Sequence, residues 1–257
     1  MRGIKGKTAI VTGGGSGIGR AICERLAEEG AVVGVFDIRA DAARDTVGRI
    51  EAGKGRAIAQ TCDITDYAAV VRAVESFENA AGAGTYILVN NAGWDTPMPF
   101  LETNEEFWKK VVAINYLGPL QVTHAVAKGM AARNGGRIIN IASDAGRVGS
   151  TTGEVVYSGC KGAPIAFAKA LARELARNNV LINTICPGPT DTPAMDAFVG
   201  SGEQGQKIRD AMVRSVPLGR IGRPDDYAGL AAFLASDDAV FMTGQTISVS
   251  GGLTMHG

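Results

Sequence analysis

The sequence lacks three features that would place it in a specialised class: an excess of charge of one sign, a long apolar run, and clustered cysteines or histidines. With 26 basic and 26 acidic residues, it has no surplus of positive charge for neutralising phosphates, so we expect no nucleic-acid partner. No run of about 18 apolar residues is present, and residues 1–7 lack the apolar core of a signal peptide. We therefore expect no membrane association and a cytoplasmic location.

Cysteine and histidine are scarce. The four cysteines form no C-x-x-C pair, and the two histidines, His124 and His256, have no ligand spacing, so the sequence predicts neither a metal site nor a disulfide framework. A chain of 257 residues buries enough surface to fold without disulfides. We expect the cysteines to be reduced and mostly buried: Cys23, Cys62, Cys160 and Cys186.

Glycine, in contrast, is abundant, with 35 residues, about twice its usual share. Between the glycine clusters, short apolar runs alternate with longer helical stretches. The runs predict strands at 7–11, 32–36, 56–60, 86–89, 137–141, 180–186 and 246–249. The helical spacing predicts helices at 18–29, 41–51, 67–81, 104–132, 157–177 and 224–235. This alternation is typical of parallel βαβ units, and it predicts an α/β protein with a doubly wound, seven-stranded parallel sheet and helices on both faces.

The chain shows no linker, repeat or low-complexity stretch, so we expect residues 1–257 to form a single domain. Residues 189–217 stand out because they carry Met and Phe side chains among Gly and Ser. They follow the sixth predicted strand, and ligands bind at the carboxyl ends of strands in such sheets. We interpret this segment as a substrate lid, with mobility indicated by Gly200, Gly202 and Gly205.

A glycine-rich loop, residues 12–19, follows the first strand and opens the first helix. Glycine lets the backbone approach a pyrophosphate closely, and the helix N-terminus offers unpaired N–H groups. This strand–loop–helix context predicts a dinucleotide site rather than a merely flexible connection. No Lys-Ser/Thr pair follows the glycines, which argues against a P-loop.

Asp37 ends the second strand, 18 residues after Gly19. A carboxylate there can accept hydrogen bonds from the adenosine ribose and repels a 2′-phosphate, which favours NAD over NADP. Arg39 lies two residues further on and is the residue that would meet such a phosphate. Asp63 follows the third strand, where it either contacts the adenine amino group or is a turn residue.

Polar residues also follow strands four to six: Asn90-Asn91-Ala92-Gly93, then Ser143, then Pro187-Gly188. Tyr157 and Lys161 lie four residues apart on one helix face near them. A cation about 5–6 Å from a phenol is worth roughly 3 kcal/mol at a dielectric near 20, about two pKa units. We expect Lys161 to lower the pKa of Tyr157 toward neutrality, which suits proton transfer to or from an alcohol.

Together these motifs resemble those of the short-chain dehydrogenase/reductase family over essentially the whole chain: Thr12-Gly13-x-x-x-Gly17-x-Gly19, Asn90-Asn91-Ala92-Gly93, Asn115, Ser143, Tyr157-x-x-x-Lys161 and Pro187-Gly188-x-x-x-Thr192. The resemblance implies a Rossmann fold, a homotetramer, and oxidoreductase activity that interconverts a secondary alcohol and a ketone. It implies a catalytic tetrad in which Tyr is the general acid/base, Ser steadies the substrate oxygen, Lys lowers the Tyr pKa and Asn anchors a water: Asn115, Ser143, Tyr157 and Lys161. The implied cofactor-binding residues are Gly13, Ser16, Gly17, Ile18, Gly19, Asp37, Asp63, Ile64, Asn90, Ala92, Gly93, Tyr157, Lys161, Pro187, Gly188, Thr190 and Thr192.

The substrate pocket should be lined by residues that follow strands four and five. We expect Trp94, Asp144, Arg147 and Val148 to contact substrate, with Asp95, Thr151, Glu154 and Val155 nearby. Residues 90–95, 143–150, 186–192 and 250–255 resemble the corresponding loops of 2-hydroxycyclohexanecarboxyl-CoA dehydrogenases of alicyclic and aromatic acid degradation. That resemblance implies NAD-dependent oxidation of a ring hydroxyl β to a CoA thioester. The alternatives are a 3-oxoacyl-(acyl-carrier-protein) reductase, a sugar, polyol or simple secondary-alcohol dehydrogenase, and a non-catalytic subunit that keeps only the fold.

Overall fold

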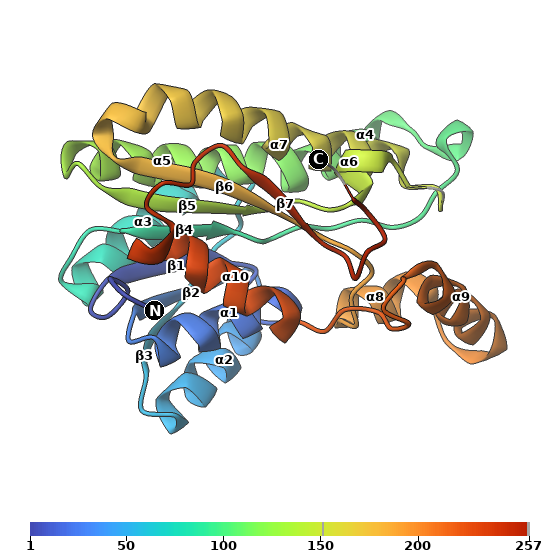
Figure 1. The fold of residues 1–257 in the computed structure, drawn as a ribbon, viewed down its shortest axis with the longest axis horizontal. Helices are drawn as coiled ribbons and strands as arrows, with labels where there is room; N and C mark the ends of the chain where they lie inside the picture. The colour runs from blue at the N-terminus through green and yellow to red at the C-terminus, as the bar shows by residue number, and fades with distance from the viewer. Residues whose placement is uncertain (151, 256–257) are drawn as a thin grey trace.

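A seven-stranded parallel sheet lies at the centre of the computed structural model, which describes residues 1–150 and 152–255 (Figure 1). The strands are ordered 3-2-1-4-5-6-7, which confirms the predicted doubly wound sheet of the Rossmann type. They are β1 (Thr8–Thr12), β2 (Val32–Asp37), β3 (Arg56–Thr61), β4 (Ile87–Asn90), β5 (Gly136–Ile141), β6 (Val180–Pro187) and β7 (Thr246–Val249).

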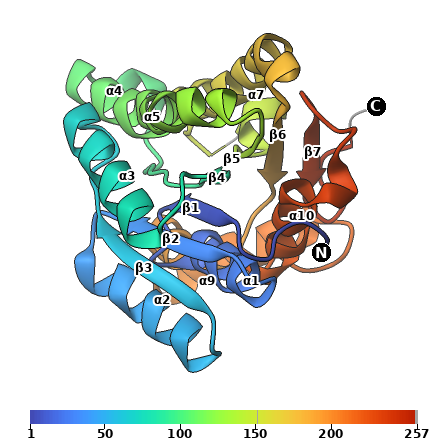
Figure 2. The ribbon, with the colours of Figure 1, turned by 90° about the vertical axis from the view of Figure 1, so that its left-hand side faces the viewer.

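Helices cover both faces of this sheet (Figure 2). One face carries α1 (Gly17–Glu28), α2 (Ala40–Ala52) and α10 (Asp225–Ala235). The other carries α3 (Tyr67–Ala81), α5 (Gly118–Ala132) and α7 (Val155–Leu175). The remaining helical segments are α4 (Glu105–Val112), α6 (Ala145–Val148), α8 (Pro193–Val199), α9 (Gly202–Ser215), and η1 (Phe100–Glu102), η2 (Ala113–Leu117), η3 (Ala176–Asn178) and η4 (Asp237–Ala239).

The strands read as continuous apolar runs because both of their faces are covered. On β1, Ala9 and Val11 pack into the core beneath α1 and α10, whereas Ile10 packs on the opposite side beneath α3 and α5. All residues of β1, β4, β5 and β6 are buried. The four cysteines are free thiols buried in this interior. Within the described residues, no helix is both long and apolar enough to cross a membrane.

The long helix predicted over 104–132 is interrupted. The α-helical stretches α4 and α5 are joined by the π-helical turn η2, in which the Gly118 N–H donates to the carbonyl of Ala113, five residues earlier. Gly118 and Pro119 begin α5 rather than kink a continuous α-helix. π-turns widen a helix locally and occur often at functional sites. This one contains Asn115.

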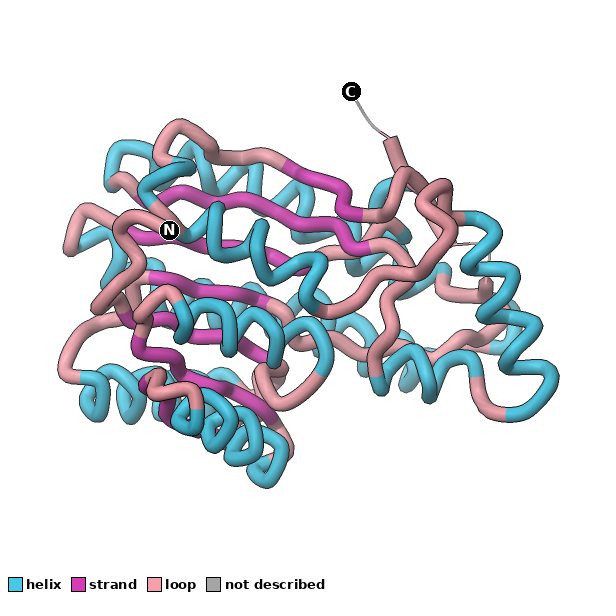
Figure 3. Tube along the Cα trace, turned by 60° about the horizontal axis from the view of Figure 1, so that its bottom comes forward, coloured by secondary structure: helices cyan, strands magenta, loops and turns pink. Residues whose placement is uncertain are grey.

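The segment 189–217, predicted as a glycine-rich lid, holds two helices, α8 and α9, beyond the carboxyl ends of the strands (Figure 3). Gly200 follows α8 and Gly202 begins α9, with positive φ angles of 72° and 77°. Glycine is favoured there because other residues rarely adopt this conformation. The glycines therefore form the turn from α8 to α9.

Candidate active site

The site forms where the direction of strand order reverses, between β1 and β4. At such a switch point the loops after neighbouring strands diverge and leave a crevice at the carboxyl edge, where ligands bind. The glycine loop after β1 and the segments after β4, β5 and β6 all reach this edge. Asp37 at the end of β2 and Asp63 after β3 lie at the same edge, so the predicted site residues come from many separate segments of the chain.

The glycine loop is folded tightly enough to exclude side chains. A Cβ atom on Gly19 would lie 2.2 Å from the carbonyl oxygen of Gly13, and Gly13 and Gly17 have positive φ angles of 63° and 52°. Ser16 is the N-cap of α1, yet its hydroxyl makes no capping hydrogen bond. The loop therefore presents backbone N–H groups, a free hydroxyl and a helix N-terminus, which fits the pyrophosphate of a dinucleotide.

The start of the lid lies against this loop. A Cβ atom on Gly17 would lie 3.2 Å from Cγ2 of Thr192, so the Thr192 side chain borders the cradle as expected. The Thr192 hydroxyl caps α8 by accepting from Met195 N–H at 3.2 Å. Thr190 differs, because its buried hydroxyl bonds to the Gly188 carbonyl and the Tyr227 phenol. Its side chain holds the strand end in place instead of facing the crevice.

Asp37 reaches back to the glycine loop. Its Oδ2 accepts from Gly15 N–H and its Oδ1 from Arg39 N–H, both at 2.9 Å. Each carboxylate oxygen can accept a further hydrogen bond. Asp37 therefore both fixes the loop and keeps lone pairs for ribose hydroxyls.

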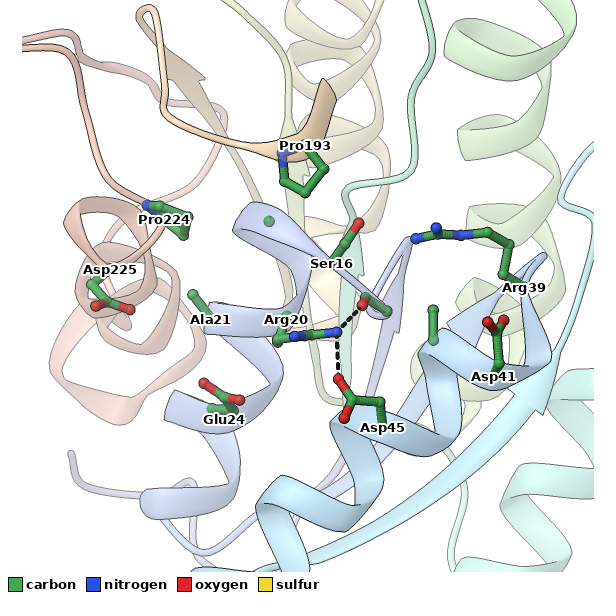
Figure 4. A pocket seen from close by; sticks show the side chains of 13 residues that line it. Ser16, Arg20, Ala21, Glu24, Arg39, Asp41, Asp45, Pro193, Pro224 and Asp225 are labelled. Carbon is green, nitrogen blue, oxygen red and sulfur yellow. Dashed lines mark hydrogen bonds and ion pairs between the residues drawn. The ribbon is translucent and has the colours of Figure 1, made fainter. Parts of the chain in front are cut away.

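A cavity of about 640 Å³ borders the outer flank of the glycine loop (Figure 4). Arg20 bridges across it, donating to the Gly15 carbonyl and pairing with Asp45 of α2 at 2.8 Å. Arg39 also lines the cavity, and its Nε lies 3.9 Å from the Asp37 carboxylate. Arg39 is thus beside the carboxylate that is expected to select the cofactor.

The two residues expected at the adenine have different surroundings. Asp63 is exposed, and its Oδ1 accepts from both the backbone and the hydroxyl of Thr65, which makes it a turn residue with Oδ2 still available. Ile64 is buried against the start of α5, where a Cβ atom on Gly118 would lie 2.5 Å from its Cδ1. Ile64 is therefore mainly a core residue at the edge of the crevice.

Two polar residues that the sequence did not single out join the β1 and β4 loops. Oγ1 of Thr12 accepts from the backbone N–H groups of Asn91 and Ala92, at 3.0 and 3.1 Å. The Asn91 amide donates back to the Thr12 carbonyl at 3.0 Å. Asn90, expected at the cofactor, instead donates into the core, to side chains on α5 and β5. Thr12 and Asn91 both occur in the motifs quoted above, but the sequence did not indicate that they bond to each other.

Lys161 is buried on α7 and aimed at the end of β5. Its Nζ donates to the Ile141 carbonyl at 3.0 Å and lies 5.6 Å from the ring centroid of Tyr157. Burial lowers the pKa of Lys161 to about 8. Gly93 lies beside it, since a Cβ atom there would be 3.2 Å from Nζ and 3.0 Å from Oδ1 of Asn115. The structure thus brings three predicted site residues around one point.

The Asn115 side chain is fully buried and tied to its surroundings. Its Oδ1 accepts from Trp94 N–H at 3.1 Å, and its amide donates to the carbonyls of Trp94 and Val111 at 2.6 and 3.0 Å. Both amide hydrogens are therefore used, and the side chain positions the loop after β4. Asn115 was expected to anchor a water. The groups left to bind one are the second lone pair of Oδ1 and the backbone of the π-turn.

The expected lowering of the Tyr157 pKa is not what the protein alone produces. Burial raises the pKa of the phenol, Glu154 and Asp95 raise it further, and only the Ser143 hydroxyl, which interacts with the phenol, lowers it. The predicted lowering of the pKa considered only the attraction between Lys161 and the phenolate. It left out the desolvation of Tyr157, which disfavours the phenolate and raises the pKa. Burial and the two acids thus favour the protonated phenol.

Two of the expected substrate residues face elsewhere. Asp144 is buried, and its two oxygens accept from the hydroxyls of Ser248 and Thr254 at 3.1 and 2.6 Å. Arg147 donates to Ser248 at 2.9 Å and reaches the Thr246 carbonyl. Both side chains join α6 to β7 and the C-terminal segment. This corrects their expected role, because these hydrogen bonds direct both side chains toward β7 and the C-terminal segment.

Trp94 and Val148 remain available to a substrate. Trp94 is half-buried, packs edge-on against Phe107 and carries the Lys110 ammonium 3.8 Å above its ring. Val148 is 61% exposed on α6. Thr151, also expected near the pocket, and His256 lie outside the described residues.

Asp95 and Glu154 bring negative charge close to Tyr157. Burial, with a contribution from Glu154, raises the pKa of Asp95 to about 6. Its Oδ2 is shielded from solvent and has no hydrogen-bond partner among the described residues. The Glu154 carboxylate accepts from the hydroxyls of Ser150 and Thr152. Both acids were expected only to line the pocket, and their effect on the phenol needed the folded chain to be seen.

Comparison with known proteins agrees with this geometry. The family profile described as enoyl-(acyl carrier protein) reductase matches residues 13–254. The (3R)-3-hydroxyacyl-CoA dehydrogenase of Mus musculus is 36% identical over 98% of both chains, and so is the (2S)-[(R)-hydroxy(phenyl)methyl]succinyl-CoA dehydrogenase subunit BbsD of Thauera aromatica. A 3-oxoacyl-[acyl-carrier protein] reductase from Brucella melitensis, solved with bound NAD, has a TM-score of 0.89 at 31% identity and covers 98% of this chain and 92% of its own.

The fold and these similarities define one class of protein. The chain belongs to the short-chain dehydrogenase/reductase family and is an oxidoreductase of that family.

Proposed function

We propose that this protein is an NAD-dependent dehydrogenase that oxidises the hydroxyl of a β-hydroxyacyl-CoA to a ketone, with 2-hydroxycyclohexanecarboxyl-CoA as its substrate and 2-ketocyclohexanecarboxyl-CoA as the product. The observation that carries the proposal is that the Tyr157 phenol interacts with the Ser143 hydroxyl while the Lys161 ammonium lies 5.6 Å from its ring centroid. These groups can hold an alcohol oxygen and move its proton.

In this proposal Ser143 holds the substrate oxygen and Tyr157 takes its proton. When bound, the cofactor would supply the hydride acceptor and the positive charge of its oxidised ring. Because the raised pKa of Tyr157 favours the phenol, Tyr157 must first release its own proton to solvent. Lys161, whose ammonium lies 5.6 Å from the centroid of the Tyr157 ring, stabilises the resulting phenolate, which then takes the hydroxyl proton and becomes a phenol again.

NAD is the proposed cofactor because Asp37 stands where a 2′-phosphate would approach. Its carboxylate is buried at the end of β2 and is fixed by two backbone N–H groups, so it cannot easily turn away. A phosphate there would face a fixed negative charge. The similar Brucella melitensis reductase was solved with NAD.

Two observations support a substrate that contains a CoA thioester and a ring. Relatives at 36% identity are named for hydroxyacyl-CoA and hydroxy(phenyl)methylsuccinyl-CoA substrates. The half-buried Trp94 and the exposed Val148 offer apolar contacts for a ring. A second candidate is a 3-oxoacyl-(acyl-carrier-protein) reductase, which is favoured by the similarity to the Brucella melitensis enzyme.

We also propose a homotetramer. Trp108 on α4 and Leu117 at the end of η2 are exposed apolar side chains, as are Val240 and Phe241 just before β7. Tetramers of the family that the chain resembles commonly pair the two long helices and the last strand between subunits. Burying them in an assembly would remove apolar groups from water.

The decisive experiment is a spectrophotometric panel of NAD and NADP against cyclic and linear β-hydroxyacyl-CoA thioesters, acyl-carrier-protein thioesters, and free alcohols. We expect NADH to form fastest with the cyclic CoA thioester. Faster turnover of acyl-carrier-protein thioesters with NADP would favour the reductase. Oxidation of a free polyol with no response to any thioester would contradict the proposal.

A further inference from the structure

The loop after β4 and the loop before α7 meet at the mouth of the active site. The Met98 N–H donates to the Gly153 carbonyl at 3.0 Å, and a Cβ atom on Gly153 would lie 3.3 Å from the Met98 backbone. Further back, Asn115 fixes the backbone of Trp94, the residue before Asp95. The position of Asp95 is therefore determined from both sides.

Each of these loops contributes one acid to the surroundings of Tyr157. Glu154 directly precedes α7 and is held by the hydroxyls of Ser150 and Thr152. Asp95 has a shielded oxygen with no hydrogen-bond partner among the described residues, so this oxygen is not used to hold the loop. Both carboxylates act on the phenol strongly enough to raise its pKa.

The acyl carbon of a β-hydroxyacyl compound lies two bonds from the carbon that reacts at Tyr157. In a free acid this carbon belongs to a negatively charged carboxylate, whereas in a thioester it belongs to an uncharged group. Two like charges about 6 Å apart at a dielectric near 20 repel by an amount equivalent to about 100-fold in affinity. The carboxylates of Asp95 and Glu154 would therefore repel the carboxylate of a free β-hydroxy acid but not the uncharged thioester.

We infer that Asp95, assisted by Glu154, is a specificity-determining residue that excludes free β-hydroxycarboxylates and admits only uncharged acyl derivatives such as thioesters. This inference rests on the proposed function and adds the class of compound that the site excludes, the free β-hydroxycarboxylates. Lys161 and the oxidised cofactor attract a carboxylate, but they do so equally in wild type and in variants at Asp95. A comparison between variants therefore isolates the contribution of the acids.

The test uses the N-acetylcysteamine thioester of a β-hydroxy acid, chosen because the enzyme oxidises it, and the corresponding free acid. For each protein, kcat/KM is measured for both compounds with saturating NAD at pH 7.5, where the Asp95 carboxyl is ionised. Asp95→Asn removes the charge and keeps the size of the side chain. Glu154→Gln is the second variant, and Glu75→Gln, an exposed acid on α3, is the matched control.

We expect the acid-to-thioester ratio of kcat/KM to rise about 10- to 100-fold in Asp95→Asn, by a smaller factor in Glu154→Gln, and not at all in Glu75→Gln. If oxidation of the acid is too slow to measure, competitive inhibition by the acid and by its methyl ester gives the same ratio. If Asp95→Asn does not fold, as judged by its melting curve, Glu154→Gln alone must show the rise.

A ratio within twofold of wild type in the folded variants would overturn the inference while leaving the proposed thioester activity intact. Wild-type enzyme that oxidises the acid as efficiently as the thioester would overturn it too. Failure to oxidise any thioester is a different result, because it removes the proposed function and this inference together.

Discussion

Replacing Lys161 with Met should remove activity and, at neutral pH, leave the fold as stable as before or more stable. Burial lowers the pKa of Lys161 from 10.5 to about 8. At about 1.4 kcal/mol per pKa unit, holding this ammonium charged in the folded protein costs about 3 kcal/mol below pH 8. Met avoids that cost but leaves the Ile141 carbonyl without its donor, which costs about 1–3 kcal/mol.

The sign of the pH dependence follows from proton binding. Between pH 8 and 10.5 the unfolded chain holds more protons on this lysine than the folded protein does, so wild-type stability rises with pH in that window. The stability of wild type minus that of Lys161→Met should therefore increase by about 3 kcal/mol from pH 7.5 to above pH 10. Buried cysteines and Tyr157 are present in both proteins, so their titration largely cancels in the difference.

The assay is reversible urea unfolding followed by tryptophan fluorescence at several pH values. Lys169→Met is the control, because Lys169 lies on the same helix with an exposed side chain and should give a difference that does not change with pH. If the difference in unfolding free energy between wild type and Lys161→Met also does not change with pH between 7.5 and 10, the reasoning is refuted. It would mean that the ammonium is not held at a cost in the folded protein.

Three further outcomes test other residues. Tyr157→Phe should retain NADH binding, measured by fluorescence titration, while turnover falls by several orders of magnitude; near wild-type turnover would exclude it as the proton carrier. Asp37→Ser should raise the NADP-to-NAD ratio of kcat/KM by about 10- to 100-fold, because a fixed negative charge is lost beside Arg39; an unchanged ratio would assign selection elsewhere. Asp144→Ala should lower unfolding stability by about 1–3 kcal/mol without changing KM, whereas a large rise in KM would restore its substrate role.

Local signals in the sequence predicted most elements to within one or two residues. The helix over 67–81 was predicted to the residue. Asp66 caps its start by accepting from Ala69 N–H, and Gly82 ends it in the left-handed conformation, with φ of 77°. Both residue types are typical of these positions. The π-turn at Asn115 could not be predicted in this way, because it depends on the bonds between Asn115 and a loop 21 residues away.

The errors at the site have a common physical origin. Asp144 and Arg147 were assigned to the substrate because they follow Ser143 in sequence, but the direction of a side chain is decided by the turn of helix that carries it. The expectation for the Tyr157 pKa considered one neighbour, Lys161, whereas burial has the largest effect, followed by Glu154 at the start of the same helix and Asp95 in the loop after β4. Charge pairs can be read from spacing, but desolvation depends on the whole surrounding fold.

Several polar residues at the carboxyl edge hold loops together and border the ligand at the same time. Thr12 joins the β1 and β4 loops, Asp37 holds the glycine loop, and Asn115 holds the loop that carries Asp95. These bonds exist before any ligand arrives, so the site does not have to be ordered when the cofactor or substrate binds. Substitutions at such residues should therefore change stability and binding together. Tyr157 has no comparable bond holding a loop among the described hydrogen bonds, so its loss should affect turnover alone.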